Sequence, residues 1–125
     1  MSEIIEKHIE ELRQHRKLDV ELIEADGLNI VIIKGYPLPG RYSKASSDLM
    51  IRLDKGYPNS KPDMFWLEED VLLKDGAVPD KAEQILESLG KKWRRFSWHF
   101  NTWNPATGNL LGYVEFIDVR LNKSK

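Results

Sequence analysis

Residues 56–66 read GYPNSKPDMFW, and the other elements of the chain can be assigned outward from this run. Pro58 and Pro62 lack the backbone N–H that a strand ladder needs, so the first part of the run predicts a rigid turn rather than a paired strand. The apolar stretch at 64–67 that follows predicts a short strand. We therefore expect a proline turn that leads directly into a strand.

The start of the chain predicts an amphipathic helix over residues 2–16. Ser2 is the expected N-cap, and acidic residues precede basic ones, as the helix dipole favours. The apolar stripe consists of Ile5, Ile9 and Leu12. His8 and His15 in the same segment are expected to be solvated.

The segment between this helix and the proline turn predicts three strands. Residues 18–34 form the expected hairpin, with a turn at Asp26-Gly27 and with Leu28, Ile30 and Ile32 facing one way. Residues 35–47 are rich in Gly, Pro and Ser and predict a loop. Alternation over 49–53 then predicts a third, half-buried strand.

Two further helices are expected after the strand at 64–67. Residues 68–79 predict irregular structure, and Asp80 is the expected cap of an inserted helix over 81–93. Its expected apolar face comprises Ala82, Ile85, Leu86 and Leu89, with Gly90 near its end. Asn104-Pro105 predicts the start of the last helix, whose stripe comprises Leu110, Val114, Ile117 and Leu121. Gly108 and Gly112 disfavour the early part of that helix.

The predicted fold is thus α+β: an N-terminal helix, a four-stranded antiparallel meander, an inserted helix and a C-terminal helix. A length of 125 residues predicts a single domain over 1–125. The net charge of −1 argues against a nucleic-acid or anionic-membrane partner. The chain has no cysteine, which excludes disulfides, thiolate zinc sites and thiol nucleophiles within it.

No phosphate-binding glycine loop and no metal-ligand spacing occurs in the sequence, so we expect neither a cofactor nor a metal. No apolar run approaches the roughly 18 residues that cross a bilayer. The acidic residues at the N-terminus do not match a signal peptide, so we expect a cytoplasmic protein.

A second block, Phe96-Ser97 followed by Trp103-Asn104-Pro105, completes a resemblance to ubiquitin-conjugating enzymes. The resemblance extends over roughly residues 2–122, and Ser97 occupies the place of the cysteine that carries the thioester in that family. Lys61 replaces the first proline of the family's Pro-Pro pair. The family's His-Pro-Asn tripeptide is missing here, so the asparagine that supports the attacked carbonyl is absent.

Three features are similar to a bacterial branch of this superfamily: Gly56-Tyr57-Pro58, the run 62–66, and the group Trp93, Ser97 and His99. That branch accompanies multi-ubiquitin-like proteins and activating enzymes of the ThiF type. The resemblance therefore implies a conjugating carrier with a ubiquitin-like protein and a ThiF-type enzyme as partners, and a monomer when alone.

The candidate catalytic residues are Ser97, as the acyl acceptor, and His99, as its general base. A serine hydroxyl needs a base, and a histidine two residues away on an extended segment points to the same side. On a helical turn the two side chains would diverge. A structural serine and a packing histidine remain the alternatives.

Three functions remain open for this site: an oxyester carrier, a non-catalytic module that binds a ubiquitin-like protein or scaffolds its enzymes, and an engineered Cys-to-Ser change that traps a complex. The basic residues of 91–95 form either a solvated face or a guide for an acidic partner or a developing oxyanion. The tryptophans at 93, 98 and 103 are expected to anchor the core or line the site.

Overall fold

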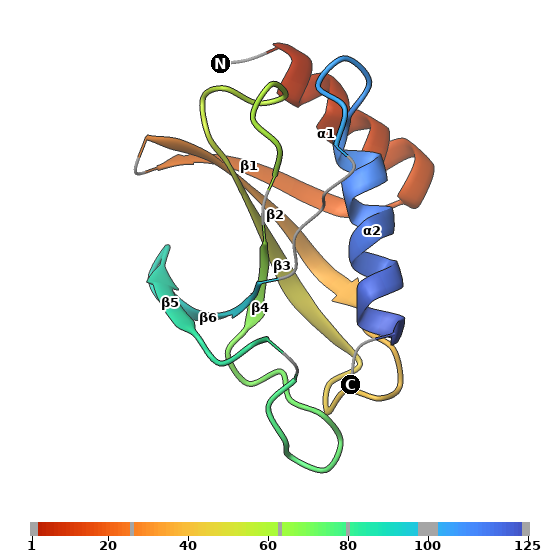
Figure 1. Ribbon diagram of the computed structural model, residues 1–125, viewed down its shortest axis with the longest axis vertical. Helices are drawn as coiled ribbons and strands as arrows, with labels where there is room; N and C mark the ends of the chain where they lie inside the picture. The colour runs from red at the N-terminus through yellow and green to blue at the C-terminus, as the bar shows by residue number, and fades with distance from the viewer. Residues whose placement is uncertain (1–2, 26, 63, 80, 98–102, 124–125) are drawn as a thin grey trace.

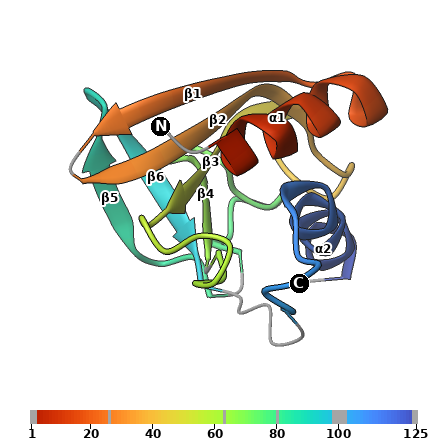
Figure 2. The ribbon, with the colours of Figure 1, turned by 90° about the horizontal axis from the view of Figure 1, so that it is seen from above.

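A computed structural model gives the architecture of the chain and describes residues 3–25, 27–62, 64–79, 81–97 and 103–123. The elements in order are α1 (Glu3–Arg16), β1 (Asp19–Ala25), β2 (Leu28–Pro37), β3 (Ser46–Leu53), β4 (Phe65–Glu68), β5 (Ile85–Ser88), β6 (Lys91–Phe96) and α2 (Leu110–Lys123). The strands form one six-stranded antiparallel sheet in the order β1-β2-β3-β4-β6-β5. The α+β class is as predicted, and Figures 1 and 2 show both helices on the same side of the sheet.

The first helix and the first hairpin follow the sequence pattern closely. Ile5, Ile9 and Leu12 are all buried in α1, as their spacing predicts. The strands β1 and β2 pair from Asp19↔Lys34 to Ala25↔Leu28, which leaves a two-residue turn. Gly27 has a φ of 73° there, in the left-handed region that a tight hairpin needs. The N-cap predicted at Ser2 and the turn position Asp26 lie outside the described residues.

The loop predicted over 35–47 is shorter than expected. The pairing of β2 with β3 changes register between Ile33 and Tyr36, and it then continues to Pro37↔Ser46. Gly35 lies in this irregularity with a φ of 63°. The bulge lets β2 bend without ending, so both flanks of the expected loop belong to strands.

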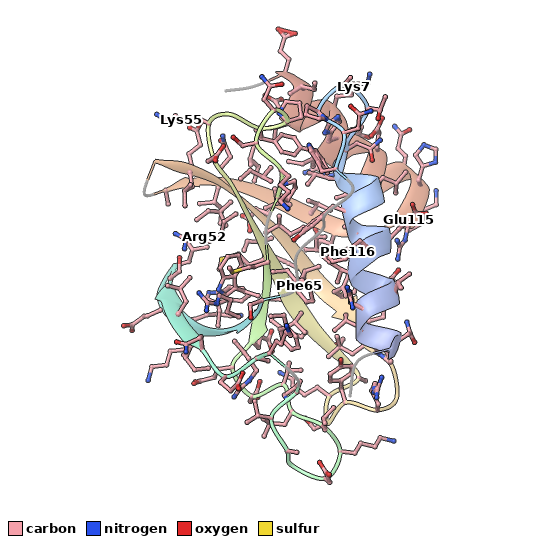
Figure 3. The ribbon with its side chains drawn as sticks, viewed as in Figure 1. Lys7, Arg52, Lys55, Phe65, Glu115 and Phe116 are labelled. Atoms are coloured by element: carbon pink, nitrogen blue, oxygen red, sulfur yellow. The ribbon has the colours of Figure 1, made fainter. Side chains whose placement is uncertain are left out.

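The sheet has apolar side chains on both faces. The inner core, between the sheet and the helices, includes Tyr36, Phe65, Phe96, Tyr113 and Ile117. The outer core, on the opposite face, consists of Ile30, Ile32, Met50, Trp66 and Trp93. Figure 3 shows Phe65 on the side of α2, and Arg52 on the side away from that helix, where its guanidinium lies 5.7 Å from the ring centre of Trp66. The stripe predicted for the last helix is also confirmed, because Leu110, Val114, Ile117 and Leu121 are buried.

The inserted helix over 81–93 is a wrong prediction. The four predicted strands form the meander β1-β2-β3-β4, but β6 and β5 extend it to a six-stranded sheet. Residues 85–93 instead belong to the hairpin of β5 and β6, which is closed by Leu89 and Gly90 with φ values of 55° and 75°. The expected apolar face does not exist, because Ala82 is buried whereas Ile85 is 44% exposed. Strand β6 pairs with β4 from Phe65↔Phe96 to Glu68↔Trp93. The edge of β4 thus supplies a strand partner that the local apolar pattern could not reveal. The expected cap, Asp80, lies outside the described residues.

The last helix begins later than predicted. Asn104 accepts a hydrogen bond from the N–H of Ala106 on Oδ1, and from the N–H groups of Thr107 and Gly108 on its carbonyl, so it caps an isolated turn. The N-cap of α2 is Asn109, whose Oδ1 accepts from the N–H of Gly112 at 2.8 Å. The capping chemistry expected of Asn104 is therefore present, but the chain turns once more before the helix starts at Leu110.

Candidate active site

Ser97 directly follows strand β6 and is held by its neighbour in that strand. Phe96 is fully buried, and its ring stacks on Phe65 of β4 with the ring centres 5.1 Å apart. Ser97 itself is half-buried. Because the preceding residue is fixed by sheet pairing and by aromatic packing, the backbone at Ser97 has a defined position at the end of the strand.

The segment 81–84 lies alongside the end of β6 and contacts Ser97. Both the backbone N–H and the hydroxyl of Ser97 donate to the Lys81 carbonyl, at 3.1 and 3.0 Å. Nearby, the N–H of Arg95 donates to the Gln84 carbonyl at 2.9 Å. A peptide carbonyl is too weak a base to remove the hydroxyl proton of a serine, so this contact orients the hydroxyl without activating it.

The second candidate residue, His99, lies outside the described residues, as does Trp98. The structure therefore neither brings His99 to Ser97 nor separates the two. Ser97 is partly exposed, and α2 begins only at Leu110.

The two sequence blocks that carry the resemblance are packed against each other. The ring of Trp103 lies 5.7 Å from that of Tyr57, and its indole N–H donates to the Pro58 carbonyl at 2.8 Å. Gly108 packs directly against the Trp103 ring, and only glycine fits there, because a Cβ at that position would lie 2.5 Å from the ring. Trp103 itself is thus packed against the proline turn, and Trp93 lies in the outer core.

His8 is the residue beside the proline turn that sequence reasoning missed. It is only 6% exposed, and the Tyr57 hydroxyl and Nδ1 of His8 are hydrogen-bonded at 2.6 Å. Burial lowers the pKa of His8, although the Glu11 carboxylate opposes that change. Burial also raises the pKa of the Tyr57 hydroxyl. The signal was available, because His8 falls on the stripe of Ile5 and Leu12. The expectation of solvation is correct only for His15, which is exposed.

The basic residues of β6 are partly engaged in structural contacts. Lys91 lies 3.3 Å from Asp48 and 3.6 Å from Glu68, with its ammonium 4.6 Å from the ring centre of Trp93. Arg94 donates to the Ala82 and Glu69 carbonyls at 2.7 and 3.0 Å. These contacts tie β6 to its neighbours, so the charges of Lys91 and Arg94 have a structural use.

The described part of the chain offers no group of three or more His, Cys, Asp or Glu residues that could hold a metal ion. Within the same residues, no helix has the length and apolar character needed to cross a membrane.

Comparison with protein families settles the class of the chain. Residues 6–124 match the model of prokaryotic E2 family E. The chain belongs to this family. The match includes both blocks that contact each other around Tyr57 and Trp103, and it confirms the predicted resemblance to bacterial ubiquitin-conjugating proteins. Searches among curated proteins and among solved structures gave no match.

Membership in prokaryotic E2 family E makes this an E2-like protein of the conjugating class, whose general partners are ubiquitin-like proteins and their activating enzymes. In this E2-like protein, the Ser97 hydroxyl lies at the end of β6, and the proline turn, α1 and Trp103 form a rigid support linked by hydrogen bonds.

Proposed function

We propose that this protein is a cytoplasmic, single-domain carrier in which Ser97 accepts the C-terminus of a bacterial ubiquitin-like protein as an oxyester. A ThiF-type activating enzyme would supply the activated acyl group, and an amine would receive it. The position of Ser97 supports this proposal best. Ser97 is partly exposed at the end of a rigid strand, within the block that resembles the cysteine-bearing stretch of ubiquitin-conjugating enzymes.

The proposed reaction has two acyl transfers. In the first, Oγ of Ser97 attacks the activated carbonyl, a C–O bond forms, and the bond to the leaving group of the activating enzyme breaks. In the second, an amine attacks the ester, a C–N bond forms, the C–O bond breaks, and Oγ recovers a proton. A base must take the hydroxyl proton in the first step and the amine proton in the second.

We assign that base to His99. A free histidine side chain has a pKa near neutrality, and His99 follows Ser97 by two residues. To react, the Ser97 hydroxyl has to leave the Lys81 carbonyl, to which it donates at 3.0 Å. The loading step therefore requires the O–H bond of Ser97 to turn away from the Lys81 carbonyl.

The hydrogen bond to Lys81 also favours a second function, a non-catalytic member that binds a ubiquitin-like protein or scaffolds its enzymes. In that case Ser97 is a structural residue that ties the end of β6 to the segment 81–84. The two functions differ in one observable, a covalent bond at Ser97.

The test is to incubate the protein with the activating enzyme, ATP and the ubiquitin-like protein, and to examine the product by mass spectrometry. An oxyester survives thiol reductants but is cleaved by hydroxide, whereas a thioester exchanges with thiols and an amide resists both. Ser97→Ala should abolish the adduct. Ser97→Cys should make it reducible by thiols, and Ser97→Lys should trap it as an amide. His99→Ala should slow loading or discharge about 100-fold.

Ser43→Ala is the matched control, because the Ser43 hydroxyl also forms a hydrogen bond with a backbone group, although it accepts, from the N–H of Leu72 at 3.2 Å. This variant should load as fast as the wild type. Binding of the ubiquitin-like protein without any adduct would establish the non-catalytic function. An adduct that persists in Ser97→Ala would place the chemistry on another residue.

A further inference from the structure

Strand β5 is an edge strand of the sheet, and its neighbour is β6, the strand that Ser97 directly follows. β5 pairs with β6 on one side and is the last strand of the sheet, so within the described residues its other side has no strand partner. Figure 1 shows this edge on the side of the molecule away from α2.

The pairing of β5 with β6 determines which backbone N–H and carbonyl groups of β5 point away from β6. Arg95 N–H donates to the Gln84 carbonyl, and in an antiparallel ladder successive residues alternate between the two sides of a strand. The backbone groups of Leu86 therefore face β6. Those of Ile85 and Glu87 face away from β6, and each offers an N–H and a carbonyl at the edge.

The two edges of the sheet are protected differently. At the β1 edge, the guanidinium of Arg13 in α1 donates to the Val20 carbonyl at 2.7 Å, so the helix occupies part of that edge. The β5 edge has neither proline nor lysine among its four residues, and Ile85 on it is 44% exposed. Sheet edges are normally blocked by charge, proline or a covering element. β5 lacks such a block except for the carboxylate of Glu87.

The direction of β5 relates the edge to Ser97. The segment 81–84 continues β5 toward its N-terminal end, and its Lys81 carbonyl accepts both hydrogen bonds from Ser97. A peptide that pairs antiparallel to β5 would therefore run toward Ser97 with its own C-terminus leading. A parallel peptide would carry its C-terminus away from that hydroxyl.

We propose that the outer edge of β5 binds the extended C-terminal tail of the ubiquitin-like partner by antiparallel strand addition. This inference rests on the proposed function, because it is the acyl transfer at Ser97 that requires a C-terminus to arrive there. Main-chain hydrogen bonds to Ile85 and Glu87 give affinity, and the side chains on the same face give specificity. Since Ile85 and Glu87 lie two positions apart on one face, the tail carries a basic residue and, two positions later, an apolar one.

The experiment uses the synthetic peptide acetyl-Thr-Lys-Thr-Val-Thr-Gly-Gly with a free carboxylate, whose lysine and valine match Glu87 and Ile85. Binding to the full-length protein is followed by NMR titration and by amide hydrogen exchange. We expect slower exchange of the Ile85 and Glu87 amides in the complex. Ile85→Pro removes one outward N–H and should weaken binding about tenfold.

Glu24→Pro is the matched control on the opposite edge of the sheet. The Val20 carbonyl in β1 points away from β2, and because alternate residues share a side, the Glu24 N–H also points away from β2. It should bind the peptide like the wild type. The Trp93 indole N–H, which donates to the Ser88 carbonyl at 3.0 Å, reports whether the hairpin stays folded in Ile85→Pro. If the hairpin of Ile85→Pro does not stay folded, a charge reversal provides the test. Glu87→Lys should not bind the lysine-containing peptide, and it should bind a peptide in which that lysine is replaced by glutamate.

Equal binding by the wild type and a folded Ile85→Pro would overturn the edge site, even if Ser97 forms its ester. Loss of binding in Glu24→Pro, or no effect of the charge reversal, would also overturn it. Peptide binding at β5 in a protein that never forms an adduct supports the edge site and removes only the ester proposal.

Discussion

At the scale of single residues, the hydrogen bond between His8 and Tyr57 joins the first helix to the proline turn. Both side chains are buried, and their rings meet edge to face with centres 5.5 Å apart. Tyr57 in turn packs on Trp103, whose indole N–H donates to the Pro58 carbonyl. His8 therefore supports the packing between the proline turn and Trp103.

The lowered pKa of His8 predicts a pH-dependent stability. Burial, the larger cause, disfavours the protonated form in the folded state, while unfolding restores an ordinary pKa near 6.5. The stabilisation is complete above pH 6.5 and is lost as the pH falls below that value, because the unfolded chain then binds the proton more readily. His8→Gln should lower the free energy of unfolding by about 1–2 kcal/mol at pH 7.5. The difference from wild type should shrink at pH 5.5.

Urea unfolding of both proteins at the two pH values measures this difference. His15→Gln changes an exposed histidine on the same helix and should retain the wild-type profile. If the difference in the free energy of unfolding between wild type and His8→Gln is the same at both pH values, His8 does not cause the pH dependence of stability.

At the scale of elements, the β5–β6 hairpin determines where Ser97 lies, and its turn is built from an unfavourable residue. Leu89 and Gly90 both have positive φ, at 55° and 75°, as a two-residue turn of this kind requires. Glycine adopts that conformation freely, whereas leucine pays about 1–2 kcal/mol for it. The pairing of β6 with β4 and the stacking of Phe96 on Phe65 hold the hairpin despite this cost.

Leu89→Asn should therefore stabilise the protein by up to about 1 kcal/mol, because asparagine tolerates the left-handed conformation. Leu89 is 40% exposed, so little buried contact is lost. Thermal unfolding measures the gain, and Gly90→Ala, which adds a Cβ at positive φ, should have the opposite sign. A lower melting temperature in Leu89→Asn would mean that the leucine makes a contact worth more than the strain.

At the scale of the whole molecule, Asp118 links three elements. Its carboxylate in α2 accepts from Arg16 at the end of α1 at 2.6 Å, and also from the hydroxyl of Tyr36 in β2. Burial, together with the hydrogen bond to Asp118, raises the pKa of Tyr36. Burial alone would lower the pKa of Arg16, but the hydrogen bond and the charge of Asp118 raise it. One carboxylate thus holds both helices against the sheet.

Asp118→Asn should reduce the free energy of unfolding by about 2 kcal/mol, because it weakens two hydrogen bonds to a charged group and leaves Arg16 without its counter-ion. Asp70→Asn is the comparison. Asp70 also forms an ion pair, with Lys44, but it is 69% exposed, and its loss should cost less than about 1 kcal/mol. Denaturant titration measures both values, and equal effects would mean that Asp118 is no more than a surface charge.

The sequence by itself determined the parts whose pattern is local. The stripes of α1 and α2, the hairpin of β1 and β2, and the strand after the proline turn follow from periodicity and turn residues, and the blocks around Tyr57 and Ser97 identify the family. Asn104 was recognised as a cap, although its turn and α2 are separate elements.

Only the tertiary structure decided that residues 81–93 do not form a helix and that residues 85–96 form a hairpin. Ile85, Leu86 and Leu89 fit one helical face, yet Leu86 packs on the outer core while Ile85 and Leu89 are exposed. It also decided the burial of His8 against Tyr57 and the contact of Ser97 with Lys81. Each of these outcomes depends on a contact with residues distant in the chain, above all with the edge of β4. A local sequence pattern does not indicate which distant surface a segment will contact.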